Sequence, residues 1–184
     1  MPRTAPAAKE TSIAVTGHAN LTGVSKPLIR EALESRLLRY PVSELTGVSC
    51  LAAGADRVFA EAVLAVEGRL VAVIPSWDYR ERMVDPGHTD DFDRLCRAAA
   101  EIKVMPYRRT TREAYAAANR ALLGRAELLM AVWDGMQGGR GGTADVVATA
   151  QAYGLPVEIV WPAGAARETH NTSRWEGRAQ GRPS

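Results

Sequence analysis

The segment 133–145 carries the densest group of residues that could bind a ligand. Within it, five glycines fall in eight consecutive positions: Gly135, Gly138, Gly139, Gly141 and Gly142. An apolar run precedes them at 128–132 and predicts a buried strand, while 146–150 predicts a helix. A glycine-rich turn between a strand and a helix presents free N–H groups and the positive end of a helix dipole, which suit phosphate or another anion. A solvated surface loop is the alternative, and the strand-loop-helix context favours the anion site.

Polar residues and glycines also follow the other predicted strands. In an open parallel sheet, ligands bind beyond the carboxyl ends of the strands, so residues there are candidates for one shared site. Two further candidates, one helical turn apart, lie on the helix that precedes the glycine-rich segment and could orient a ribose or a base. The candidates outside the glycines of 135–142 are Gly17, His18, Gly54, Asp56, Arg108, Tyr115, Asn119, Asp134 and Thr143.

Several of these residues have an equally direct structural interpretation. Asp56 and Asp145 lie in the first turns of predicted helices, where a carboxylate stabilises the helix dipole without any ligand. Tyr115 and Asn119 could pack against the sheet instead of contacting a ligand. Either Arg108 or Arg109, after the fourth predicted strand, could clamp a phosphate. Both interpretations stay open for each residue.

Strands and helices alternate along the whole middle of the chain. This pattern predicts an α/β, Rossmann-like three-layer domain around a mostly parallel six-stranded sheet of order 3-2-1-4-5-6. Ser25 is expected to cap the first helix, and the polar stretch 76–89 to form a lid or a solvated connection. The expected strands are 11–17, 47–51, 69–74, 101–105, 128–132 and 155–161; the expected helices are 25–40, 55–66, 90–100, 111–126 and 143–153.

Composition divides the chain into a domain and two tails. Residues 1–10 and 163–184 are rich in Pro, Ala, Gly, Arg and polar residues, which predicts a disordered N-terminal tail and a flexible C-terminal tail around a domain at 11–162. No apolar stretch reaches the ~18 residues that span a bilayer. We therefore expect a cytoplasmic protein without membrane contacts.

Charge and cysteine content bear on the partners. The chain has 23 basic and 21 acidic side chains; without the four arginines and two glutamates of 163–184, residues 1–162 carry 19 of each. A neutral domain of this kind predicts that nucleic acid is an unlikely partner. Cys50 and Cys96 show no paired spacing, so we expect both to be free thiols. The sequence has no cluster of His, Cys and carboxylate residues at metal-ligand spacing, so we expect no structural metal site.

Three segments, in this order, resemble the SLOG superfamily of nucleotide-binding proteins, most closely its YpsA-like members. They are residues 14–18 (AVTGH), residues 51–56 (LAAGAD), and a closing block of 119–120, 126–135 and 141–143. The resemblance spans about 11–162 and implies a homodimer. It also implies kinship with LOG-type phosphoribohydrolases, which cut the N-glycosidic bond of nucleoside monophosphates. Their motif ends in Gly-Thr-x-Glu; aligned on Gly142 and Thr143, it places Asp145 where the proposed catalytic glutamate stands.

These observations leave two principal functions open. The first is a sensing or carrier domain that binds a nucleotide or nucleotide-derived phosphate ligand, including NAD derivatives, with no resident cofactor assigned. The second is an N-glycosidase that releases the base from a nucleoside 5′-monophosphate, with Asp145 or Asp56 as the catalytic carboxylate. The shorter side chain of Asp145 favours the first, because glycosidic chemistry depends on sub-ångström placement of the acid. A protein-interaction scaffold is a third, weaker reading.

Overall fold

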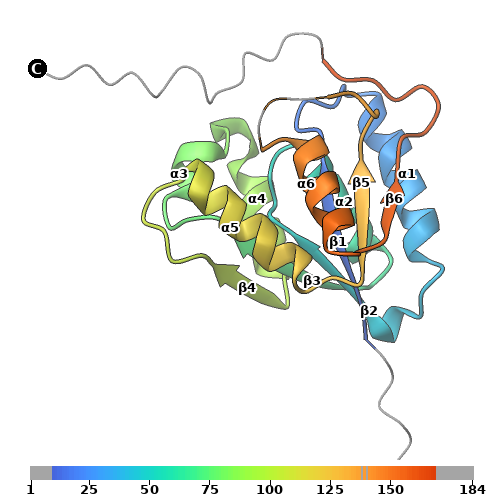
Figure 1. The fold of residues 1–184 in the computed structure, drawn as a ribbon, viewed down its shortest axis with the longest axis horizontal. Helices are drawn as coiled ribbons and strands as arrows, with labels where there is room; N and C mark the ends of the chain where they lie inside the picture. The colour runs from blue at the N-terminus through green and yellow to red at the C-terminus, as the bar shows by residue number, and fades with distance from the viewer. Residues whose placement is uncertain (1–9, 138, 140, 169–184) are drawn as a thin grey trace, which may run out of the picture.

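Unbroken apolar runs form the middle of a parallel sheet. The computed structural model describes residues 10–137, 139 and 141–168, and within them six strands pair in the order β4-β3-β2-β1-β5-β6 (Figure 1). All five strand pairs are parallel. The α/β fold class and the six-stranded sheet predicted from the sequence are confirmed. The strands are β1 (Thr11–Gly17), β2 (Leu45–Ser49), β3 (Arg69–Ile74), β4 (Glu101–Val104), β5 (Leu128–Val132) and β6 (Val157–Ile159).

Helices cover both faces of this sheet. One face packs against α1 (Ser25–Leu37), α2 (Ala55–Ala65) and α4 (Thr89–Ala98), through side chains such as Leu33, Phe59 and Leu95. The other face packs against α5 (Arg112–Leu123) and α6 (Thr143–Ala152), through Leu122 and Val146 among others. In the described part of the chain, no helix is long and apolar enough to cross a membrane. Both cysteines are free thiols.

The predicted strand order was wrong in one respect. The sequence placed the fourth strand between the first and the fifth, whereas β4 lies at the edge of the sheet, beside β3. Its residues explain this position: Glu101 and Lys103 interrupt the apolar pattern, and Ile102 is 46% exposed. Charged side chains are tolerated at an edge and not between two central strands. The order in which successive strands are added to the sheet therefore reverses between β1 and β5, and ligands are expected to bind at that point.

The connections differ from prediction at three places. The polar stretch 76–89 contains a short helix, α3 (Tyr79–Met83), and a 3₁₀ turn, Pro86–His88. A second 3₁₀ turn, Val42–Glu44, precedes β2. Ser25 begins α1 but does not cap it, because its hydroxyl bonds the backbone of Ala166 instead.

The fold extends past residue 162, where the sequence placed the start of a tail. Residues 163–168, here called the strap, run back across the β1–α1 connection. Arg167 forms an antiparallel bridge with Leu21, and Glu168 N–H donates to Asn20 O at 2.8 Å. These contacts bring the end of the described chain to the carboxyl edge of β1. Of the segment predicted as a tail, residues 169–184 lie outside the described part, as do residues 1–9 of the N-terminal one.

Candidate functional site

The reversal point between β1 and β5 holds a pair of polar side chains. His18 follows β1 and Asp134 follows β5, and His18 Nε2 lies 2.9 Å from Asp134 Oδ1. With its proton on Nε2 the ring donates to Asp134 Oδ1 and leaves Nδ1 as an acceptor; with its proton on Nδ1 it accepts from Asp134 N–H at 3.4 Å. The shorter contact favours the proton on Nε2. Burial lowers the pKa of His18 below its usual 6.5, against the opposing effect of Asp134, which favours the neutral ring. Trp161 packs edge-on against it, with ring centroids 5.6 Å apart.

Asp134 is also bound from two other directions. Its Oδ1 accepts from Met136 N–H at 3.0 Å, which fixes the turn after β5, and its Oδ2 lies 2.8 Å from Nε of Arg167. Burial acts to raise the pKa of Asp134, but the bonds from Met136 and His18, with the charge of Arg167, lower it overall. Asp134 is therefore an ionised, fully engaged carboxylate. Its contacts orient His18 and Arg167.

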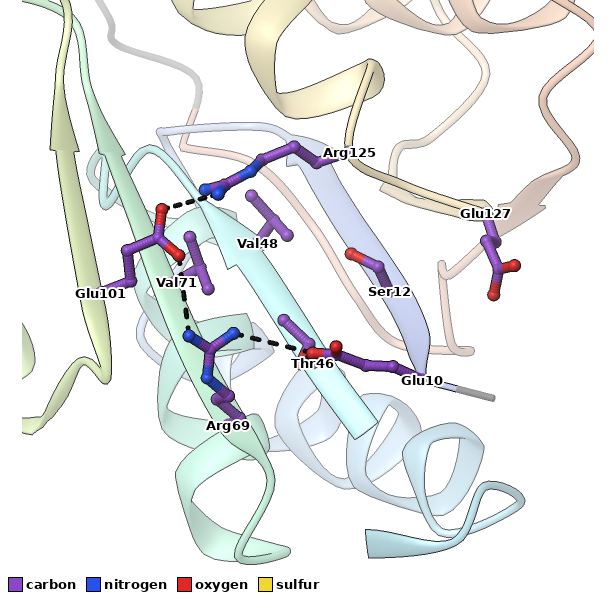
Figure 2. Close-up of a pocket in the computed structure, with 9 residues that line it drawn as sticks. All are labelled: Glu10, Ser12, Thr46, Val48, Arg69, Val71, Glu101, Arg125 and Glu127. Carbon is purple, nitrogen blue, oxygen red and sulfur yellow. Dashed lines mark hydrogen bonds and ion pairs between the residues drawn. The ribbon is translucent and has the colours of Figure 1, made fainter. Parts of the chain in front are cut away.

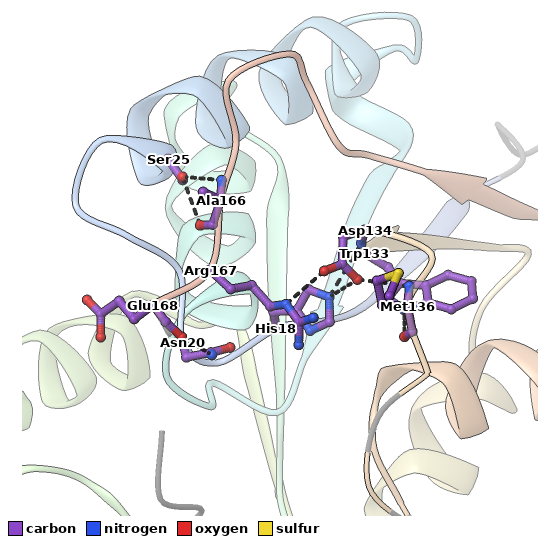
Figure 3. Close-up of polar contacts among 9 residues, drawn as sticks. All are labelled: His18, Asn20, Ser25, Trp133, Asp134, Met136, Ala166, Arg167 and Glu168. Carbon is purple, nitrogen blue, oxygen red and sulfur yellow. Dashed lines mark hydrogen bonds and ion pairs between the residues drawn. The ribbon is translucent and has the colours of Figure 1, made fainter. Parts of the chain in front are cut away.

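Arg167 reaches this pair from the strap, and Figure 3 shows its guanidinium beside His18 and Asp134. The strap is held by Ser25, whose hydroxyl accepts from Ala166 N–H at 2.8 Å and donates to Ala166 O at 3.0 Å. Asn20 adds a bond from its side-chain amide to Glu168 O at 3.0 Å. The side chain of Arg167 is about one third exposed (34%), so its charge is available at the surface of the site.

The glycine-rich segment lies next to this cluster, between β5 and α6. Gly135 and Gly141 have φ of +81° and +78°, a conformation that favours glycine. A Cβ on Gly135, Gly139 or Gly141 would meet nothing within 4 Å, so the space beside these backbones is open. Gly142 differs: its φ is −80°, and a Cβ would lie 2.9 Å from Gly139 O. Gly138, also a predicted ligand contact, lies outside the described residues.

The first turn of α6 is already occupied by its own residues. Asp145 is exposed, and its Oδ2 accepts from Gly141 N–H at 2.6 Å. This carboxylate therefore takes one of the amides that an anion would use. Thr143 is buried, at 8% exposure, so its side chain does not line an open surface.

Gly17 and Gly54, both predicted to face the ligand, are needed for packing. A Cβ on Gly17 would lie 2.5 Å from Ala55 Cβ and 2.7 Å from Val132 Cβ. Gly54 has φ of +74°, and its Cβ would lie 2.4 Å from His18 O. Both glycines let the start of α2 approach β1 closely, and the bond from Ala55 N–H to His18 O at 3.0 Å completes that contact.

Asp56 lies beneath the β2–α2 turn. Its carboxylate accepts from Cys50 N–H at 3.0 Å and from the Ser49 hydroxyl at 3.3 Å, which stabilises a turn that contains Leu51 at a φ of +54°. Burial raises the pKa of Asp56 to about 6, against hydrogen bonds from Cys50, Ala52 and Ser49. Its contacts are those of a structural residue, and they do not include the glycine-rich segment.

Three other predicted ligand residues do not join the cluster. Tyr115 packs edge-on against the buried Tyr79, with ring centroids 6.0 Å apart, and burial raises its pKa to about 12. Asn119 is half-buried on α5. Arg108 follows β4, four strand spacings from β5, or roughly 19 Å at the usual spacing. Its assignment beside the reversal point depended on the wrong strand order.

A cavity of about 360 Å³ lies at the opposite, amino-terminal edge of the sheet (Figure 2). Its charges are paired with one another: Glu101 lies 2.6 Å from Arg125 and 3.6 Å from Arg69, which also lies 3.6 Å from Glu10. The bond from Arg125 is the main cause that lowers the pKa of Glu101. This cavity is a poor candidate for a ligand-binding site. Its charged side chains form ion pairs with one another, and parallel sheets bind ligands at the opposite, carboxyl edge.

Arg167 is the residue that sequence reasoning missed. It stands in a stretch without apolar periodicity, and its pairing with Leu21 joins two segments far apart in the chain. Its one sequence signal was an arginine shortly after the last strand, and that signal does not reveal which loop the strap crosses.

No protein-family model and no curated protein matches the chain. Solved structures do match. DNA processing protein A from Streptococcus pneumoniae superposes with a TM-score of 0.61 at 19% identity, over 82% of this chain and 50% of that one. The Helicobacter pylori protein of that name superposes with a TM-score of 0.56 at 18% identity, over 82% of this chain and 65% of that one. The molybdenum cofactor binding protein of Rippkaea orientalis superposes with a TM-score of 0.55 at 16% identity, over 82% of this chain and 76% of that one.

These matches correct the expectation that nucleic acid is an unlikely partner. The Helicobacter structure describes a single-stranded DNA binding mode, and its fold is shared over most of this chain. The expectation failed because net charge says nothing about where charges lie, and single strands are held by local basic and aromatic surfaces. The chain spans half to two thirds of the two DNA processing proteins it matches.

At these identities, the similarity concerns architecture. The chain has the Rossmann-like α/β fold that these DNA processing and molybdenum cofactor binding proteins share with it.

Proposed function

We propose that this protein is a carrier or sensing domain that binds a phosphate-bearing small molecule, a nucleotide or a nucleotide derivative, between the ends of β1 and β5. Arg167 would hold the phosphate, and the open space beside the glycine-rich backbone would admit the rest of the ligand. Nδ1 of His18 would accept a hydrogen bond from a hydroxyl or amino group of the same ligand.

The position of Arg167 is the observation that carries this proposal. Asp134 pairs with Nε at 2.8 Å and so holds the guanidinium at the site. Within the described residues, Arg167 pairs with no carboxylate other than Asp134. A guanidinium can donate in parallel to two oxygens of one anion. The open backbone at Gly139 and Gly141 lies on the connection that leaves the same strand end.

The state of the carboxylates favours binding over hydrolysis. Asp134 is held by three partners, Asp145 bonds Gly141 N–H, and Asp56 is buried under another turn. A glycosidase needs a carboxylate that faces the sugar. A carrier role also agrees in kind with the cofactor-binding protein of the same fold from Rippkaea.

A thermal-shift series tests the proposal. The wild-type protein is heated with AMP, NAD, inorganic phosphate, or adenosine, which lacks the phosphate. A ligand at about 100 times its Kd stabilises by ~2.7 kcal/mol, or roughly 5–10 °C for a chain of this size. We expect such a shift with a phosphate-bearing ligand and a much smaller one with adenosine. No shift with any of them at millimolar concentration, or an equal shift with adenosine, would overturn the proposal.

A further inference from the structure

Two connections at the far side of the same edge form a fixed platform. They are residues 75–78 after β3 and residues 105–111 after β4. Trp77 N–H donates to Tyr107 O at 2.9 Å, and Asp78 Oδ1 accepts from both the N–H and the hydroxyl of Thr110, at 2.7 and 2.9 Å. Burial acts to raise the pKa of Asp78, but these bonds lower it overall, so the bonded, ionised form is favoured.

The platform carries an exposed aromatic ring on one connection and exposed cations on and just after the other. Trp77 is 69% exposed, although indole is among the side chains most stabilised by burial. Arg108, Arg109 and Arg112 are exposed and make no ion pair within the described part of the chain. Most other described arginines do make one: Arg30, Arg36, Arg39, Arg69, Arg80, Arg82, Arg94, Arg125 and Arg167.

Fold stability does not explain these residues. Arg108, Arg109 and Arg112 stand immediately before and at the start of α5, where the helix dipole is positive and a cation is unfavourable. The exposed indole likewise contributes no buried area. A surface that places both on rigid loops suits a ligand with negative charge and flat, stackable groups.

We propose that Trp77, Arg108, Arg109 and Arg112 form a binding surface for single-stranded nucleic acid. The indole stacks on an unpaired base, and the arginines contact the flanking phosphates. A duplex hides its base faces, and an acidic peptide would use the arginines but gain little from the indole. The surface is separate from the site at Arg167, because β2 and β1 lie between the ends of β3 and β5.

Fluorescence anisotropy with a labelled twelve-residue oligothymidylate at low salt tests this surface. Trp77→Ala should weaken binding roughly 5- to 150-fold, the loss of one stacked base, and Trp77→Phe should restore most of it. Changing Arg108, Arg109 and Arg112 together to Gln should weaken binding. It should also make the negative slope of log K against log salt less steep, by about 2. Tyr153→Ala and Arg97→Gln are matched controls and should leave the oligonucleotide affinity unchanged. Both residues are exposed and lie at the carboxyl-terminal ends of α6 and α4, away from the platform.

The proposal fails if the wild-type protein does not bind the oligonucleotide, or if Trp77→Ala binds it as tightly as Tyr153→Ala does. It also fails if poly-glutamate of equal charge binds as tightly as the oligonucleotide, since that result would indicate an unspecific cationic surface. Trp77→Ala should keep the thermal shift that the phosphate-bearing ligand gives, which separates this outcome from that of the nucleotide site.

Discussion

Nε of Arg167 lies 2.8 Å from Oδ2 of Asp134, and this contact joins the strap to the turn after β5. Both side chains are partly exposed, so the pair itself adds little stability. Its effect is geometric, because it holds a cation at the point where the strand order reverses, between β1 and β5. The strap thereby adds Arg167 to His18 and Asp134, which follow the central strands β1 and β5.

The strap depends on Ser25, whose buried hydroxyl bonds both backbone groups of Ala166. Ser25→Ala leaves those groups without that partner, so we expect a loss of about 1–3 kcal/mol in the free energy of unfolding. Urea denaturation measures it. Ser43→Ala, at an exposed residue, is the control, and equal stability of the two variants would contradict the assignment.

Gly54 and Gly135 share a positive φ but differ in the space around them. Gly135→Ala should cost about 1–2 kcal/mol for the backbone conformation alone. Gly54→Ala should cost ~1–3 kcal/mol more, because its Cβ would overlap His18 O. Denaturation midpoints of the two variants decide this, and equal losses would show that the close approach of α2 to β1 is not limiting.

Asp56 should give stability a distinctive pH dependence. Its pKa is about 6 in the fold and 3.8 without it, so the folded state retains a proton that the unfolded state has lost. Its contribution is therefore fully present below pH 4 and decreases as the pH rises to about 6, by an order-of-magnitude ~3 kcal/mol.

Asp56→Asn removes this titration. Chemical denaturation of both proteins between pH 4 and 7 should give a difference in unfolding free energy, variant minus wild type, that grows with pH. The subtraction cancels the other carboxylates, such as Asp78 and Asp134, whose lowered pKa values act in the opposite direction. A difference independent of pH would disprove the raised pKa.

Asp145 separates a binder from a phosphoribohydrolase. We expect no free base when the protein is incubated with nucleoside monophosphates, and Asp145→Asn should change stability by only ~0.3–1 kcal/mol, the value of a helix-dipole contact. Chromatography of the reaction mixture measures base release. Release above a protein-free control, abolished in Asp145→Asn, would assign catalysis to this carboxylate.

Local patterns were sufficient to predict most elements. The strands 69–74 and 128–132 have the bounds that their apolar runs predicted, and α6 begins at Thr143 as expected. The position of β4 was predicted wrongly because order in a sheet depends on pairing between distant strands, although Glu101 and Lys103 carried the signal of an edge.

The candidate site was only partly accessible to sequence reasoning. His18 and Asp134 follow from the rule that ligands gather at strand ends. Glycines, however, serve close packing and ligand approach alike, and only the neighbours of Gly17 and Gly54 reveal packing. The pairing of Arg167 with Leu21 joins distant segments and leaves no local pattern.

Calorimetric titration of wild type, Arg167→Gln and Arg97→Gln with the nucleotide that gives the largest thermal shift tests the central claim most directly. Arg167→Gln should weaken binding about 10- to 150-fold, the loss of charge-assisted bonds worth ~1.5–3 kcal/mol, while Arg97→Gln binds like the wild type. The corresponding nucleoside, which lacks the phosphate, should bind all three proteins alike. Equal nucleotide affinity in Arg167→Gln and wild type would contradict the assignment of Arg167 as the phosphate-binding residue.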